Sequence, residues 1–222
     1  MKILKEGLPF IIISLVIGIA LIFAAIMPLL VDPMPFIMLV LGIISLIFAD
    51  FCIYFFRDPD IQINIDDKAV LSPCNGKVME IEECETENIV RVFLSIFDVH
   101  LQRSPISGLV TGIEHRKGKF YAAWNPKAQS ENEQNIIKID GSSDSGHSVI
   151  VRQIAGFLAR RCVVRVKEGD RITQGEMIGL IKFSSQVDLH LDKNIKIKVK
   201  PQDRVAAGLT VIGEMTMIGE IK

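Results

Sequence analysis

The sequence predicts a mostly β protein that is preceded by a pair of membrane-spanning helices. Two long apolar runs occupy the first 56 residues of the 222-residue chain. From residue 61 onward, short segments rich in Val and Ile alternate with turns that contain Gly, Asn or Asp, which is typical of β-strands. A segment near the C-terminus also occurs twice. A chain of this length has room for one folded domain in addition to the helices.

The apolar runs predict a transmembrane helical hairpin over residues 1–56. Residues 7–31 carry no charge, and a bilayer requires about 20 apolar residues per helix. Residues 31–35 contain an acid and two prolines, which cannot continue a helix and predict a turn. The second run, residues 36–56, is interrupted only by Asp50. A cleaved signal peptide is the alternative. We favour the hairpin because the first run is long and a second follows it without a clear cleavage site.

Positive charges predict the orientation of this hairpin. Lys2 and Lys5 precede the first run and Arg57 follows the second, whereas the turn carries Asp32. By the positive-inside rule, both ends of the hairpin face the cytoplasm. We therefore expect residues 57–222 to form a β-domain on the cytoplasmic side of the cell (inner) membrane.

Composition and residue spacing argue against several classes of function. The net charge of −1 gives no sign of a nucleic-acid-binding surface. The cysteines form no C-x-x-C pair, so we expect reduced thiols rather than a zinc site or disulfides. The histidines are equally scattered, so no metal site is expected. These residues are Cys52, Cys74, Cys84, Cys162, His100, His115, His147 and His190.

Short apolar segments predict the strands of the β-domain. Residues 118–134 break this pattern, because they are polar and include the single Trp. We expect them to form a loop with some helix. The expected strands are residues 69–71, 77–82, 89–95, 109–115, 136–139, 148–154, 161–166, 178–183, 186–191 and 195–199.

An internal repeat indicates the architecture of the domain. Residues 165–175 align with residues 198–208, and each copy reads as a strand, a tight turn, a second strand and a Gly. Two copies are too few for a solenoid. They match the two quasi-symmetric halves of a lipoyl-type barrel, and residues 72–78 look like an opening turn of the same architecture. We therefore expect a barrel-sandwich-hybrid-like (lipoyl-like) β-domain with its core between packed sheets.

Several motifs occur in order along the chain. Phe-Phe-Arg-Asp-Pro stands at residues 55–59, Gly-Lys-Phe at 118–120 and Glu-Asn-Glu-Gln-Asn at 131–135. Gln-Ile-Ala-Gly begins at residue 153, and Phe-Ser-Ser-Gln-Val-Asp spans 183–188. Together these motifs resemble the short form of the phosphatidylserine decarboxylase proenzymes, over most of the chain beyond the second apolar run.

The resemblance implies an enzyme that cuts itself between Ser184 and Ser185. The Ser185 hydroxyl would attack the Ser184 carbonyl, the resulting ester would eliminate, and hydrolysis would release ammonia and leave a pyruvoyl group at position 185. That ketone would condense with a substrate amine and accept electrons as CO₂ leaves, a role that PLP plays elsewhere. No diffusible cofactor or metal would be needed.

The same resemblance implies the substrate and the partners. The substrate would be the membrane phospholipid phosphatidylserine and the product phosphatidylethanolamine. The two chains made by the cut, residues 1–184 and 185–222, would stay associated. The sequence leaves open the lipid specificity and whether the protein forms a homo-oligomer.

His100 is the expected acid/base residue. Asp98, Val99 and His100 resemble the Asp-x-His strand end of the family, and the unperturbed pKa of His lies near physiological pH. Without the resemblance, a structural role for this His would be the better interpretation. The long form of the family has a second His three residues later, but this chain has Arg103 there, as the short form does.

Two residues depart from the family pattern. Asn75 stands where Asp is usual, and that Asp is thought to help a base to activate the serine. An amide can hydrogen-bond but cannot carry the charge. Ser184 stands where Gly is usual, and Gly has backbone freedom that a strained scissile peptide could use. A processing-defective, membrane-anchored β-scaffold is therefore kept as an alternative.

A lipoyl- or biotinyl-type carrier that uses Lys182 is a second alternative. Lys182 lies between the two barrel halves, as the modified lysine of a carrier does. However, its flanking Ile and Phe lack the Met or Asp usual at such hairpins. Carriers are also not usually built onto a membrane hairpin, so the enzyme is favoured.

Overall fold

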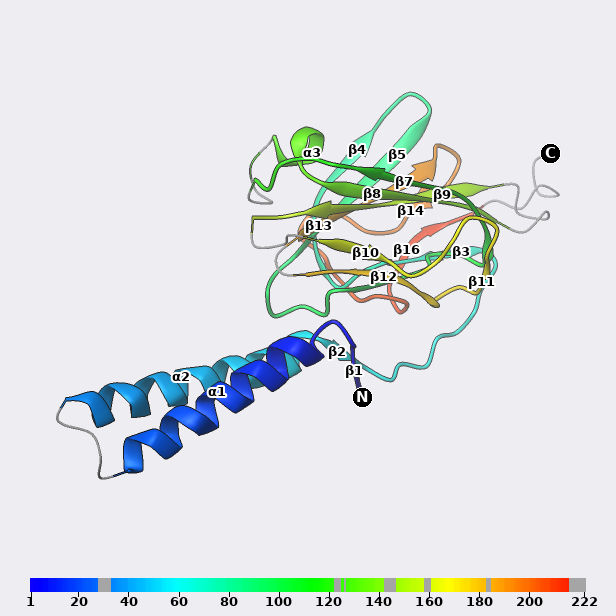
Figure 1. Ribbon diagram of the computed structural model, residues 1–222. Coiled ribbons are helices and arrows are strands. Elements are labelled where there is room, and N and C mark those ends of the chain that lie inside the picture. Colours follow the sequence, from blue (N-terminus) through cyan, green and yellow to red (C-terminus); the bar gives the residue numbers. More distant parts are fainter. Residues whose placement is uncertain are drawn as a thin grey trace, which may run out of the picture. The chain divides into compact units, whose positions relative to one another are not determined.

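The computed structural model confirms a mostly β protein with two N-terminal helices (Figure 1). The chain divides into two compact units, residues 1–60 and 61–222. The first unit contains the two long helices and the second contains the large sheets. The residues that the structure describes are 1–27, 33–121, 125, 127–141, 147–157, 161–182 and 185–215.

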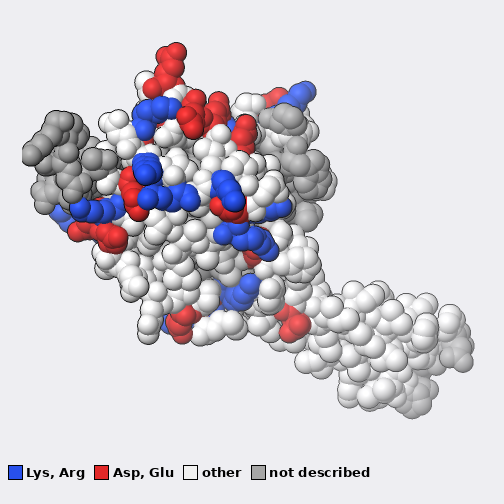
Figure 2. All heavy atoms as spheres, turned by 180° about the vertical axis from the view of Figure 1, so that it is seen from behind, with Lys and Arg blue, Asp and Glu red and all other residues white. Residues whose placement is uncertain are grey.

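The N-terminal unit consists mainly of two apolar helices, α1 (Leu8–Ile26) and α2 (Met34–Phe55). Their mean hydropathies are 2.9 and 2.7, and both are long enough to cross a membrane. They approach closely at Gly18 and Gly42, because a Cβ on Gly18 would lie 3.1 Å from the Gly42 carbonyl oxygen. Small residues permit such contacts between membrane helices. Figure 2 shows this unit mostly in white, with the charged residues gathered over the other unit.

A short ladder joins the two ends of this helical pair. β1 (Lys2–Ile3) pairs antiparallel with β2 (Arg57–Asp58). The segment before α1 therefore meets the segment after α2, as expected for a hairpin of helices. Residues 31 and 32 of the predicted turn lie outside the described residues.

Three antiparallel sheets build the C-terminal unit (Figure 1). The eight-stranded sheet has the order β11-β7-β8-β9-β13-β5-β4-β15, and the two smaller sheets are β10-β12-β6 and β14-β16-β3. None of these sheets, as formed by the described residues, closes into a barrel. The strands are β3 (Ala69–Leu71), β4 (Gly76–Glu83), β5 (Glu87–Leu94), β6 (Leu101–Arg103), β7 (Gly108–Arg116), β8 (Gln134–Gly141), β9 (Ser148–Ala155), β10 (Cys162–Val164), β11 (Arg171–Ile172), β12 (Met177–Ile181), β13 (Ser185–Asp192), β14 (Lys196–Ile197), β15 (Arg204–Val205) and β16 (Val211–Glu214).

Each predicted strand segment overlaps a strand of the structure. The strand expected at residues 161–166 is shorter in the structure, where β10 ends at Val164 because the chain then enters the turn of the repeat. Phe183, at the end of another predicted segment, lies outside the described residues. The helix expected within residues 118–134 is α3 (Ala128–Glu131). The list of expected strands missed β1, β2, β6 and β16, which are too short for alternation of apolar residues to show. β11 and β15 are the second strands expected in the two copies of the repeat.

Alternation along β13 decides which of its side chains enter the core. Val187, Leu189 and Leu191 are fully buried in the main apolar cluster. Because successive side chains of a strand point to opposite faces, Ser185 at the start of β13 shares their face. Asp188 therefore points to the other face of the large sheet. Because Ser185 lies on the core face of β13, its hydroxyl group is inside the domain.

The predicted repeat is present as two equivalent turns. In one turn, the Asp170 carboxylate accepts the backbone N–H of Lys167 at 2.7 Å. In the other, the Asp203 carboxylate accepts that of Lys200 at 2.9 Å. The strand after the first turn, β11, pairs with β7, and the strand after the second, β15, pairs with β4. The two copies thus flank opposite edges of the large sheet.

Backbone conformation follows the same repeat. Gly169 and Gln202 occupy equivalent turn positions with φ of +92° and +79°. Gly175 and Gly208 close the two copies with φ of +81° and +70°. Gln202 is the one non-glycine residue with a positive φ among the described residues. The second copy therefore keeps the turn even where its sequence has lost the Gly.

Two Ser-Pro loops extend this pseudosymmetry to the first half of the domain. The Leu71 N–H donates to the Pro105 carbonyl at 3.0 Å, and the Arg103 N–H donates to the Pro73 carbonyl at 2.8 Å. Each loop therefore supplies an acceptor for the strand that leads into the other. This pairing supports the interpretation of residues 72–78 as an opening turn of the same architecture.

Candidate active site

Ser185 lies at the start of a central strand and is completely buried. β13 pairs with β5 on one side and β9 on the other, which puts Ser185 opposite Leu94 and Ala155. The exposed fraction of Ser185 is 0%, and its Oγ has no hydrogen-bond partner among the described residues. Buried hydroxyl groups are nearly always hydrogen-bonded, so such an atom points to chemistry rather than to packing.

A hydrogen bond places the backbone of His100 beside Ile181, four residues before Ser185. The Ile181 N–H, at the end of β12, donates to the His100 carbonyl at 3.0 Å. Ile181 and Ser185 are separated by so few residues that their Cα atoms can be at most about 14 Å apart. The intervening Ser184, the other residue of the expected cut, lies outside the described residues.

The tautomer of His100 follows from its hydrogen bond. His100 is buried, and its Nδ1 lies 2.8 Å from the Asp98 carbonyl oxygen. A carbonyl oxygen only accepts, so Nδ1 carries the hydrogen. In the neutral ring the lone pair therefore resides on Nε2, which is the state that a general base requires.

Asp98 acts on His100 through its backbone rather than through its carboxylate. That carboxylate accepts the Ser95 N–H at 2.8 Å and a hydrogen bond from the Arg204 guanidinium at 3.2 Å. These contacts fix the turn that leads from β5 towards β6. The carbonyl that orients His100 is held in place as a result.

Asn75 is engaged in a structural contact with Ala207. Its Oδ1 accepts the Ala207 N–H at 2.6 Å. At the pseudosymmetric position, Ser107 Oγ accepts the Gln174 N–H at 3.0 Å. Because the other half of the domain has an equivalent contact, we assign Asn75 a structural role in closing its turn. That role requires an oxygen acceptor but no charge.

Four polar residues, which we call the polar row, run from the edge of the large sheet to His100. His115, Asn135 and Gln153 are directly opposite one another on β7, β8 and β9. Gln102 on β6 completes the row in a smaller sheet. Asn135, Gln153 and Gln102 are buried. Sequence reasoning assigned no role to these residues, although Asn135 and Gln153 lie within the motifs quoted above.

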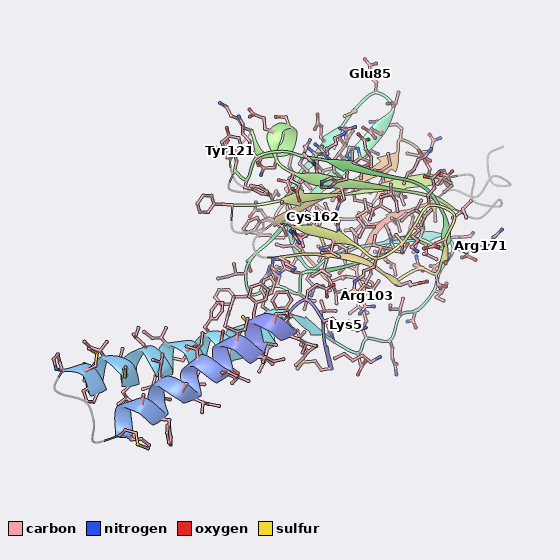
Figure 3. The ribbon with its side chains drawn as sticks, in the orientation of Figure 1. Lys5, Glu85, Arg103, Tyr121, Cys162 and Arg171 are labelled. Carbon is pink, nitrogen blue, oxygen red and sulfur yellow. The ribbon has the colours of Figure 1, made fainter. Side chains whose placement is uncertain are left out.

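Asn132 fixes the backbone next to Ser185. Its amide nitrogen donates to the Ala155 carbonyl at 2.7 Å and to the Tyr121 carbonyl at 2.8 Å. Its Oδ1 accepts the Tyr121 N–H at 2.7 Å. Figure 3 shows Tyr121 beside α3. The loop around α3 is thereby joined to the strand that pairs with Ser185.

A buried carboxylate locks β13 into the sheet. Asp188 Oδ2 lies 3.9 Å from Arg91 Nε on β5 and 3.7 Å from Arg152 Nη1 on β9. Gln186 donates to Asp188 Oδ1 at 2.5 Å. Burial raises the pKa of Asp188, and Gln186 with the two guanidinium groups opposes that rise without cancelling it.

The cysteines are unsuited to nucleophilic catalysis or metal binding. None of the four forms a disulfide. Burial raises the pKa of Cys74 and of Cys162, so both thiols are neutral near pH 7. In the part of the chain that the structure describes, no group of three or more His, Cys, Asp or Glu side chains could hold a metal ion.

Comparisons with known proteins point to one family. The family model described as phosphatidylserine decarboxylase matches residues 48–213. A phosphatidylserine decarboxylase proenzyme of Symbiobacterium thermophilum is 39% identical over 95% of this chain and 94% of its own. The proenzyme of Solibacter usitatus is 42% identical over 74% of this chain and 78% of its own, and that of Magnetococcus marinus is 37% identical over 95% and 94%.

The contact of Asn75 with Ala207 predicts its mutational behaviour. Asn75→Ala removes a half-buried acceptor of a backbone N–H, so we expect the free energy of unfolding to fall by about 1 kcal/mol. Ser107→Ala removes the equivalent acceptor and should cost a similar amount, whereas Asn75→Asp keeps an oxygen in place and should cost less. Thermal unfolding of each variant, in a chain with Ser185→Ala, measures the effect. An Asn75→Ala protein as stable as its parent would contradict the structural role.

Proposed function

This chain belongs to the phosphatidylserine decarboxylase family, and we propose that it converts phosphatidylserine to phosphatidylethanolamine. The observation that carries the proposal is the match over residues 48–213, which includes both His100 and Ser185. The hydroxyl of Ser185, which is buried and has no hydrogen-bond partner among the described residues, supports it further, because the family chemistry requires a serine at this position. The names of the relatives also include the word proenzyme, which fits a chain that is cut.

We propose that Ser185 is the source of a pyruvoyl group. The peptide bond between Ser184 and Ser185 breaks, one water is consumed and one ammonia leaves, so Ser184 ends as a carboxylate. When formed, the group supplies a ketone that binds the substrate amine and takes up the electron pair released with CO₂. Leu94 and Ala155, on either side of Ser185, would exclude water from it.

The strand pairing supports association of the two chains after the cut. Residues 185–222 contain β13, which pairs with β5 and β9 of residues 1–184. β15 also pairs with β4, and β16 with β3. The smaller chain would therefore remain an integral part of the sheets without a covalent link.

The proposed role of His100 is to hold and deliver a proton. Its Nδ1–H is fixed on the Asp98 carbonyl, so only Nε2 can exchange a proton with a reacting group. Burial of the ring keeps bulk water from competing for that proton. Protonation of the substrate carbon after CO₂ leaves is a step that needs such a group.

Apolar side chains near the candidate site suit a lipid substrate. Phe97 and Phe157 are 64% and 68% exposed. Leu94 and Ala155 are the two residues opposite Ser185. Phe97 lies three residues after Leu94, and Phe157 lies two residues after Ala155. Aromatic side chains are enriched at the level of lipid headgroups. We propose that they help the domain to draw its substrate from a bilayer.

The carrier alternative has less support. Lys182 is half-buried, and its backbone N–H donates to the Arg161 carbonyl at 3.3 Å. A carrier lysine has to project freely from a hairpin tip. The processing-defective scaffold remains distinguishable by experiment, because it would give one unmodified chain.

The first test concerns the cut. Denaturing electrophoresis should show chains of residues 1–184 and 185–222, the smaller with an N-terminus blocked to Edman chemistry. Ser185→Ala should abolish the cut and the activity, because it removes the attacking hydroxyl. Ser184→Gly should keep the cut, since it restores the family residue. An active protein that runs as one intact chain with an unmodified Ser185 would rule out the pyruvoyl mechanism.

The second test concerns His100. In protein that has already been cut, His100→Ala should lower the decarboxylation rate by roughly 10²-fold or more, the usual scale of general acid–base help. The rate is measured as CO₂ release from phosphatidylserine in mixed micelles. A cut His100→Ala protein with unchanged turnover would remove His100 from the mechanism.

The third test concerns the membrane. We propose that residues 1–56 anchor the chain and that residues 57–222 form a catalytic domain on the cytoplasmic side, because α1 and α2 are long and apolar and their outer ends carry Lys2, Lys5 and Arg57. Protease added to inverted membrane vesicles should digest the β-domain. Full protection of the domain in such vesicles would reverse the proposed orientation.

A further inference from the structure

We propose that Gln153 is a positioning residue, which sets His100 through the polar row. This inference deepens the proposed function and depends on the role given there to His100. It would add three buried amides, those of Gln102, Gln153 and Asn135, to the working parts of the site.

The row is a continuous chain of hydrogen bonds. His115 Nδ1 lies 2.7 Å from Asn135 Oδ1, and Asn135 Nδ2 donates to Gln153 Oε1 at 3.0 Å. Gln153 Nε2 donates to Gln102 Oε1 at 2.7 Å. Gln102 Nε2 then donates to the His100 carbonyl at 2.9 Å. The chain crosses from the large sheet to a smaller one between Gln153 and Gln102.

The direction of every bond follows from its end point. The His100 carbonyl can only accept, so Gln102 must present its NH₂ there and its oxygen to Gln153. By the same reasoning Gln153 presents its NH₂ to Gln102, and Asn135 presents its NH₂ to Gln153. All bonds therefore point towards His100. Bonds aligned in this way polarise one another and become stronger.

The neighbouring backbone leaves space for Gln153. Gly179 on β12 faces it, and a Cβ on Gly179 would lie 2.6 Å from Gln153 Nε2. A side chain at position 179 would therefore push the amide away from Gln102. The exposed fractions of Gln102 and Gln153 are both 0%, so an unmatched polar atom there would not be solvated by bulk water.

The row connects the sheet that carries Ser185 to the strand that follows His100. Gln153 pairs with Val187 on β13, two residues from Ser185, and all three side chains share one face of the sheet. Gln102 lies on β6 of the facing sheet, two residues after His100. The bond between Gln153 and Gln102 thus ties the sheet that carries Ser185 to the strand that begins directly after His100. The inferred effect is on where Nε2 of His100 points.

The Gln153→Glu variant changes which hydrogen bonds position 153 can donate and leaves its packing nearly unchanged, because the two side chains have nearly the same shape. A protonated carboxyl group can still donate to Gln102 and accept from Asn135, whereas an ionised one presents only acceptors. Burial raises the pKa of such a carboxyl group. The variant should therefore resemble the unchanged protein at low pH and lose the correct polarity as pH rises through the pKa of Glu at this position.

The titration of Glu at position 153 can be distinguished from that of the other ionisable groups around it. His115, beyond Asn135, and His100, beyond Gln102, are the ionisable members of the chain. On the core side, the Cys162 thiol of β10 stays neutral because burial raises its pKa. Arg152 and Asp188 point to the opposite face of the large sheet.

The first readout is the rate of decarboxylation by protein that has already been cut, because that is the step in which His100 delivers a proton. CO₂ release from phosphatidylserine in mixed micelles is followed from acid to neutral pH. We expect the Gln153→Glu rate to match the unchanged protein at low pH and to fall about tenfold below it at high pH. Gln174→Glu is the matched control, because Gln174 is also buried but donates to Ala69 and Pro105 outside the row. A rate ratio that does not change with pH, or a Gln174→Glu ratio that falls in the same way, would overturn the proposal.

The second readout does not require the cut. In a Ser185→Ala chain labelled with ¹⁵N-histidine, the ring nitrogen shifts of His100 report its tautomer. We expect the Nδ1–H tautomer in the parent and a mixture of tautomers with Gln153→Leu, provided that both unfold cooperatively. An unchanged tautomer with Gln153→Leu would refute the positioning role. An uncut parent protein, by contrast, would count against the proposed function alone.

Discussion

The double pairing of β13 is the interaction on which the candidate site depends. β13 pairs with β5 along its whole length and with β9 from Ser185 to Leu191, and Asp188 adds ionic contacts to an arginine on each neighbour. This register places Ser185 at the start of the strand, on the core face, between Leu94 and Ala155. A shift by one residue would turn Ser185 outward and bring Asp188 into the apolar core. The register therefore determines whether the hydroxyl is available for chemistry.

Local pattern was sufficient to predict the helices, most long strands and the repeat. Apolar runs and Val/Ile alternation depend on neighbouring residues, so they can be read from the sequence. β6 and β16 could not, because such short strands exist only through pairing with β12 and β3. Ser185 and His100 were named from motifs, and their roles stay predictions. The polar row could not be found in advance, because its members are distant in sequence and meet only through the register of three strands and the packing of two sheets.

The pseudosymmetry changes how the departure at Asn75 is interpreted. From sequence, Asn in place of Asp suggests a weakened catalytic group. In the structure, Asn75 and Ser107 do the same work in the two halves, since each accepts a backbone N–H from the end of a repeat. Two different side chains satisfy this requirement, so the position calls for an acceptor of suitable reach. The departure is therefore compatible with an intact fold around Ser185.

The interlocked Ser-Pro loops also bear on the order of events after synthesis. Leu71 and Arg103 each depend on an acceptor in the opposite loop, and the backbone N–H groups of Gly175 and Gly208 are satisfied by Ser104 and Ser72. Neither half can complete its hydrogen bonds alone, so the domain should fold cooperatively. A ribosome-bound chain that ends before residue 208 lacks part of this arrangement. The environment of Ser185 is thus assembled only after residue 208 has been made.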